Sequence, residues 1–104
     1  MIDAVRIDEL KLEIGEDDFA EVLEIFIAEI EATLAAMDVS APPATIAAEL
    51  HSLKGSAQNI GFSAFAEICV GAEASGLTPD LHDRLVVTFR ESKRLVSAEG
   101  LTVT

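Results

Sequence analysis

The spacing of the apolar residues constrains this chain most, because they recur every three or four positions between short breaks at glycine and proline. No segment alternates apolar and polar residues over the length of a strand. The breaks fall at Gly15, Ser40–Pro43, Gly61 and Gly76–Pro79, and the 104 residues suffice for one domain. We therefore predict a single all-α domain over residues 1–104, an antiparallel four-helix bundle with a short additional N-terminal helix.

Capping residues predict where most of these helices begin and end. Asp8 is expected to cap a first segment of about seven residues, which Gly15 ends. A second helix is expected from Glu16 to Met37, and a last one from Pro79, capped by Thr78, to the region of Gly100. The apolar stripe of the second helix is predicted to consist of Phe19, Leu23, Phe26, Ile30 and Met37.

The third predicted helix, about residues 43–60, carries the most informative side chains. Its apolar stripe consists of Ile46, Leu50, Leu53, Ala57 and Ile60. At about 100° per residue, His51 points about 140° away from the centre of this stripe, and therefore to solvent. Lys54 lies about 80° from the same centre, at the rim of the core.

Small residues surround His51 on the helix surface. Ala47, Ala48 and Gly55 stand at positions i−4, i−3 and i+4, and Lys54 stands at i+3. A glycine inside a helix costs about 0.5–1 kcal/mol relative to alanine, so Gly55 needs a reason. We expect that it lets another molecule approach the imidazole, while Lys54 compensates the charge of a phosphoryl group.

The segment from His51 to Gly61 reads HSLKGSAQNIG and resembles the signature of histidine-containing phosphotransfer (Hpt) domains. In that signature a histidine is followed by Lys-Gly at the third and fourth positions and by a glycine ten positions on. An acidic N-terminal helix pair with Phe26 and a Cys-x-x-x-Glu segment at Cys69–Glu73 are similar as well. The resemblance covers essentially the whole chain.

The resemblance implies the roles of individual residues. His51 would be the phosphorylated residue, accepting the group from an aspartyl phosphate of a receiver domain, and Lys54 would stabilise the phosphoryl group. Gln58 would contact that group or the receiver. Glu73 or, second, Glu67 would orient the imidazole ring. The chain would need no cofactor of its own, because the receiver supplies Mg²⁺.

The resemblance also implies a function and its partners. The chain would be a phosphocarrier of a multistep two-component phosphorelay, not an enzyme, with no ATP site of its own. Its partners would be response-regulator receiver domains and a (hybrid) histidine kinase. The alternative is an adaptor that binds receiver domains or a histidine kinase without carrying phosphate.

Two isoleucines of the second helix are further candidates for the docking surface. Ile27 lies at the edge of the apolar stripe and Ile25 well outside it. Both would meet a receiver if they are exposed, and both would pack under the first helix if they are not; the sequence favours neither.

The charge of the chain excludes some partners. Seven basic and nineteen acidic residues give 7 − 19 = −12, which argues against nucleic acid and anionic membranes. No segment resembles a signal peptide or a membrane span, so we expect the protein in the cytoplasm. We also expect it to be a monomer. Cys69 is the single cysteine, and His82 has no second ligand at metal spacing, so no metal site is expected.

Overall fold

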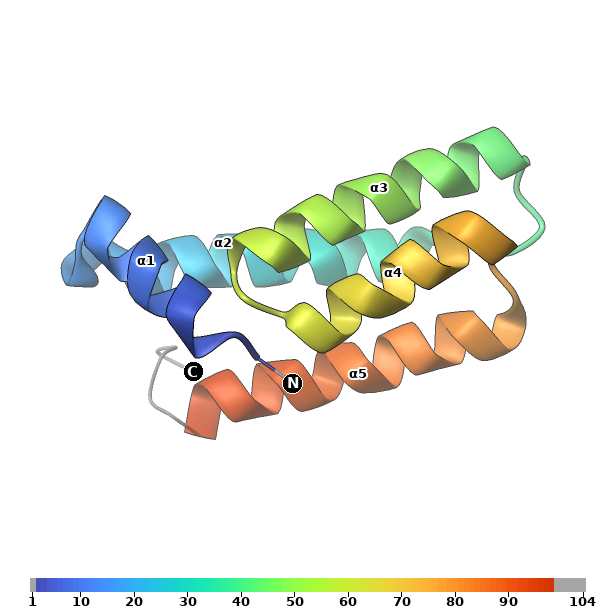
Figure 1. The fold of residues 1–104 in the computed structure, drawn as a ribbon. Coiled ribbons are helices and arrows are strands. Elements are labelled where there is room, and N and C mark those ends of the chain that lie inside the picture. Colours follow the sequence, from blue (N-terminus) through green and yellow to red (C-terminus); the bar gives the residue numbers. More distant parts are fainter. Residues whose placement is uncertain (1, 99–104) are drawn as a thin grey trace.

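The computed structural model describes residues 2–98, and this part of the chain forms five helices without any strand (Figure 1). The helices are α1 (Ala4–Ile14), α2 (Glu16–Ala36), α3 (Pro43–Asn59), α4 (Ser63–Ser75) and α5 (Pro79–Ala98). The predicted all-α class is therefore confirmed. The predicted end of the last helix near Gly100 lies outside the described residues.

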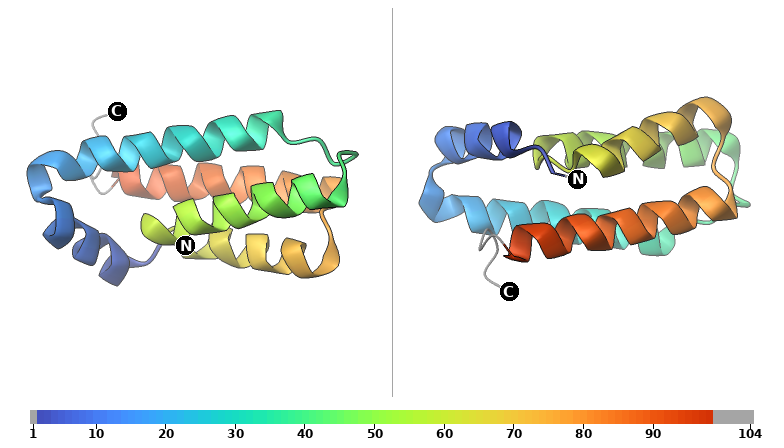
Figure 2. Two further views of the ribbon diagram at one scale, coloured as in Figure 1. Left: turned by 90° about the horizontal axis from the view of Figure 1, so that it is seen from above. Right: turned by 60° about the horizontal axis from the view of Figure 1, so that its bottom comes forward.

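Four of the helices lie side by side, and α1 occupies one end of the molecule (Figure 1). Helices α2, α3, α4 and α5 alternate in direction, and α3 packs mainly against α4 and also against α2. Figure 2 shows that α1 folds back beside the beginning of α2, next to the turn between α3 and α4. Helix α1 therefore lies against the N-terminal part of α2, beyond the turn that joins α3 and α4.

The core runs through all five helices and is aromatic where α4 meets α5. The ring of Phe89 lies 6.3 Å from that of Phe62 and 6.1 Å from that of Phe65, measured between centroids. Both Phe62 and Phe65 are fully buried, which anchors the α3–α4 turn on α5. Because every predicted apolar residue of α3 is buried, the orientation of this helix follows its stripe.

The beginning of α1 differs from the prediction. Asp3, not Asp8, caps the helix, and its carboxylate accepts a hydrogen bond from the Arg6 backbone N–H at 3.2 Å. The Asp3 N–H also donates to the Gly61 carbonyl at 2.6 Å, and Arg6 Nε donates to the Asn59 carbonyl at 3.0 Å. Contacts with the end of α3 thus place the cap of α1 at Asp3 and not at Asp8, so the helix starts earlier than the local sequence indicates.

The predicted helix boundaries at Gly15, Gly76 and Thr78 agree with the structure. Gly15 and Gly76 follow α1 and α4 with φ angles of +83° and +92°, a backbone region that favours glycine. The Thr78 hydroxyl accepts a hydrogen bond from the Leu81 N–H at 3.1 Å, as expected of the cap of α5. None of the helices in the described part of the chain is long and apolar enough to span a membrane.

The buried face of α2 is wider than predicted and includes Ile27. The buried residues of this helix are Phe19, Leu23, Ile27, Ile30 and Leu34. Phe26 and Met37 are only partly buried. Because α2 packs against α1, α3 and α5, its apolar arc extends beyond a single narrow stripe. The possibility that Ile27 forms part of an exposed docking surface is therefore wrong, since only 8% of this residue is exposed.

Candidate functional site

The exposed face of α3 carries the side chains that the sequence analysis singled out. His51 lies there between two buried neighbours, Leu50 and Leu53, which point into the core. Among the other exposed residues of α3 are Ala47, Ala48, Gly55 and Gln58. The predicted direction of His51 is confirmed, because the buried stripe fixes the rotation of the helix.

The imidazole of His51 is open to an incoming group. Within the described part of the chain, His51 makes no hydrogen bond or ion pair. An unbonded, exposed ring presents the lone pair of a neutral ring nitrogen to a reaction partner. The surroundings of the other histidine, His82, are different. His82 is half-buried, and its Nε2 donates a hydrogen bond to the Leu34 carbonyl near the end of α2, at 3.1 Å.

Gly55 leaves open space one turn beyond His51. A Cβ atom built at Gly55 would meet no heavy atom within 4 Å outside its own helix segment. Internal packing therefore gives no reason for a glycine at this position, although it lowers the helix propensity. The absence of a side chain leaves the surface beside His51 free. This agrees with the expectation that Gly55 lets another molecule approach the imidazole.

Lys54 lies at the rim of the core, as predicted, and its side chain forms an ion pair with a residue of α4. Its Nζ lies 3.6 Å from Oε1 of Glu73, and the two side chains are 23% and 27% exposed. The carboxylate of Glu73 thus contacts the cation instead of the His51 ring. No contact in the described residues supports the ring-orienting role predicted for Glu73. The physical reason is that an ammonium group attracts a carboxylate more strongly than a neutral imidazole does.

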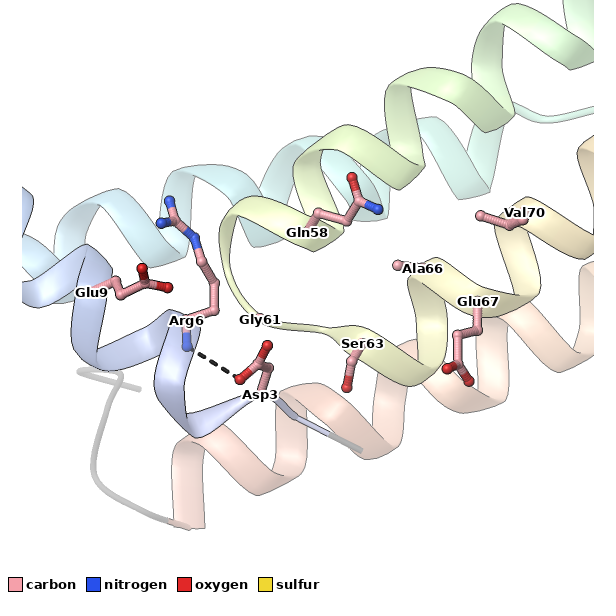
Figure 3. Close-up of a pocket in the computed structure, with 9 residues that line it drawn as sticks. All are labelled: Asp3, Arg6, Glu9, Gln58, Gly61, Ser63, Ala66, Glu67 and Val70. Carbon is pink, nitrogen blue, oxygen red and sulfur yellow. Dashed lines mark hydrogen bonds between the residues drawn. The ribbon is translucent and has the colours of Figure 1, made fainter.

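Glu67, the second ring-orienting candidate, belongs to a different part of the surface. It lines a hollow of about 450 Å³ at the junction of α1, α3 and α4, together with Gln58 and Arg6 (Figure 3). Gln58 lies two helical turns from His51, about 10 Å along the axis. Asp3 and Glu9 add two further carboxylates to this hollow, so it is acidic and would repel a phosphoryl group.

Ile25, half exposed on α2, remains available to a docking partner.

Cys69 is excluded as a nucleophile by its surroundings. It is fully buried in α4, and burial raises the pKa of its thiol to about 12, with the negative charge of Glu73 adding to the shift. The thiol therefore stays protonated at neutral pH.

No group of three or more histidine, cysteine or acidic residues that could hold a metal ion occurs among residues 2–98.

His51, Lys54 and the small residues beside them combine three features that an acceptor of a phosphoryl group needs. The nucleophile is an exposed imidazole, a cation lies one turn away, and small residues leave room for a partner. Phosphoryl transfer needs positioning and charge compensation more than covalent help from the acceptor, and the face of α3 offers both.

Comparisons with known proteins bear on the same region. Searches against curated proteins and against solved structures found no match. The family model of the Hpt domain matches residues 21–96, which is more than half of the chain and includes His51, Lys54 and Gly55. The chain therefore belongs to the Hpt domain family, whose members carry phosphoryl groups in two-component signalling.

Proposed function

We propose that this protein is a phosphocarrier of a multistep phosphorelay, with His51 as the residue that carries the phosphoryl group. It accepts the group from the aspartate of a receiver domain, including a receiver linked to a histidine kinase, and passes it to another receiver. In this proposal it acts as a cytoplasmic monomer without an ATP site. The observation that carries the proposal is the exposed, unbonded His51 beside Lys54 on α3 of an Hpt domain.

The transfer is a displacement at phosphorus. The lone pair of the unprotonated ring nitrogen of His51 attacks the phosphorus atom of the aspartyl phosphate, and an N–P bond forms. The O–P bond breaks, and its electron pair stays on the receiver's aspartate as a carboxylate. The proton on the second ring nitrogen remains on the ring or passes to water. The reverse steps return the phosphoryl group to another receiver.

Charge compensation during this step is divided between the two proteins. Lys54 provides one positive charge from this chain, a single helical turn from the reacting nitrogen. The receiver would bring Mg²⁺ held by its own carboxylates. Gly55, Ala47 and Ala48 would allow the receiver's active site to reach His51 closely.

The proposal is tested with a receiver domain that carries labelled aspartyl phosphate, in the presence of Mg²⁺. We expect label on this protein that is labile in acid and stable in base, as a phosphoramidate is. Binding of the receiver without transfer of label would favour the alternative function, a non-phosphorylated adaptor. Neither binding nor label with any of a panel of receivers would contradict the phosphocarrier function.

Lys54→Ala is expected to slow transfer from the receiver about ten- to a hundredfold, because a hydrogen bond to a charged group contributes about 1.5–3 kcal/mol. Its free energy of unfolding should change by at most about 1 kcal/mol, since the lost ion pair is partly exposed. Rapid-quench kinetics and denaturant unfolding measure the two effects. If unfolding shifts strongly while the transfer rate does not change, Lys54 is a structural residue.

Gly55→Ala is expected to stabilise the protein by about 0.5–1 kcal/mol, because alanine has the higher helix propensity and its Cβ meets open space. The methyl group should nevertheless slow transfer about three- to tenfold by displacing the docked receiver. Gly71→Ala is the matched control, because Gly71 is also helical with open space but lies beside α5. It should stabilise equally and leave transfer unchanged; equal transfer rates in both variants would contradict the role of Gly55.

A further inference from the structure

The ion pair between Lys54 and Glu73 is more protected from solvent than the pairs Arg6–Glu13, Lys93–Glu31 and Arg94–Glu91. Its two side chains are 23% and 27% exposed, whereas each of those three pairs has at least one partner that is more than half exposed. Water and salt therefore screen this pair less than the others. The cation that faces His51 along the helix is not free, because a carboxylate of the neighbouring helix already neutralises it.

Glu73 also faces the turn of α3 that carries His51. It lines a hollow of about 380 Å³ together with Ala47 and Leu50, which precede His51 by four residues and by one residue. Lys54 follows His51 by three residues, which places their Cβ atoms about 5–6 Å apart. The ammonium group therefore belongs to a residue about one helical turn from His51, and the carboxylate that pairs with it lines the hollow beside the same part of α3.

A phosphoryl group on His51 would change the electrostatics of this area. The group carries close to two negative charges at neutral pH. A free Lys54 would stabilise it, whereas a Lys54 paired with Glu73 presents a nearly neutral couple. In addition, Glu73 repels the phosphoryl group directly. Both effects make phosphohistidine less stable relative to aspartyl phosphate than it would be without Glu73.

We propose that Glu73 is a positioning residue that holds Lys54 as its counter-ion and so increases the tendency of His51 to give its phosphoryl group away. This inference rests on the proposed function of His51. When the N–P bond breaks and the O–P bond to the receiver's aspartate forms, the ring nitrogen regains its electron pair. Lys54 then interacts with Glu73 alone again, and the restored ion pair favours transfer of the phosphoryl group from His51 to the receiver.

The test is the equilibrium between phosphorylated receiver and phosphorylated carrier. We expect Glu73→Gln to shift the equilibrium toward phosphohistidine about two- to fivefold, the range of a partly exposed ion pair. Glu31→Gln is the matched control, because Glu31 forms an interhelical ion pair with Lys93, 3.0 Å long, between α2 and α5. It removes the same charge from the chain and should leave the equilibrium unchanged.

Three further measurements separate a charge effect from a structural one. Glu73→Asp keeps the negative charge and should retain an equilibrium close to that of the wild type. High salt should reduce the effect of Glu73→Gln, since screening weakens the charges. In a Lys54→Ala background, Glu73→Gln should have a smaller effect, because the part that acts through Lys54 is absent.

The outcomes distinguish this inference from the function on which it rests. If wild type and Glu73→Gln both become labelled and reach the same equilibrium, the inference is wrong and the phosphocarrier function stands. A shift toward the phosphorylated receiver in Glu73→Gln would also overturn it, because Glu73 would then stabilise phosphohistidine. If neither protein becomes labelled, the proposed function itself fails.

Discussion

Replacing His51 with glutamine is expected to abolish phosphorylation and to leave the fold intact. Glutamine is polar and tolerated in helices, but its amide nitrogen is no nucleophile, so no N–P bond can form. Because His51 is exposed and makes no hydrogen bond within the described residues, its loss should change the free energy of unfolding by less than about 0.5 kcal/mol. Label transfer and thermal unfolding of the same preparation measure both effects.

The matched control for this variant is His82→Gln, which replaces the second of the chain's two histidines. His82 is half-buried at the α2–α5 contact, where its Nε2 is bonded to a backbone carbonyl. We expect this variant to lose some stability, about 1 kcal/mol for the missing hydrogen bond, and to accept label normally. Label on His51→Gln at the level of the wild type would contradict the assignment of the site.

Gly61→Ala is expected to cause the largest loss of stability, about 2–4 kcal/mol, because strain, a clash and a weakened hydrogen bond add together. Gly61 has a φ angle of +75°, which L side chains rarely adopt. A Cβ atom there would lie only 2.8 Å from the Asp3 carbonyl oxygen and 3.2 Å from Ile7. The Asp3 backbone is held in place because its N–H donates to the Gly61 carbonyl, and Ile7 is held because it is buried in the core.

Thermal unfolding measures this effect, and for a domain of this size it corresponds to a decrease in Tm of roughly 10–25 °C. Gly71→Ala serves as the control, because it adds the same methyl group at a helical backbone with no atom nearby. That variant should be slightly more stable than the wild type. A Gly61→Ala protein as stable as the wild type would show that α1 is not fixed to the α3–α4 turn.

The direction of His51 could be predicted from the sequence because it depends on one helix alone. Four buried residues of α3 and Ile60 recur at helical spacing, and this stripe determines which way every other side chain of α3 points. The rim position of Lys54 and the exposure of Gly55 follow from the same stripe. The caps at Gly15, Gly76 and Thr78 are equally local.

Features that depend on contacts between helices were not predictable from residue spacing. Asp3 caps α1 because the end of α3 holds the chain there, while Asp8 matches the local cap pattern equally well. Ile27 is buried because α2 packs on three sides. The partner of Glu73 depends on how α4 is placed against α3. The family resemblance implied a contact with the ring, whereas the structure shows an ion pair with Lys54.

The central claim is that His51 carries the phosphoryl group, and the most direct measurement locates this group within the chain. Wild-type protein is incubated with a phosphorylated receiver and Mg²⁺, digested at neutral to basic pH, and analysed by tandem mass spectrometry. The account predicts one phosphorylated peptide, with the group on His51. A phosphoryl group on His82 or on an acidic residue, with His51 unmodified, would contradict it.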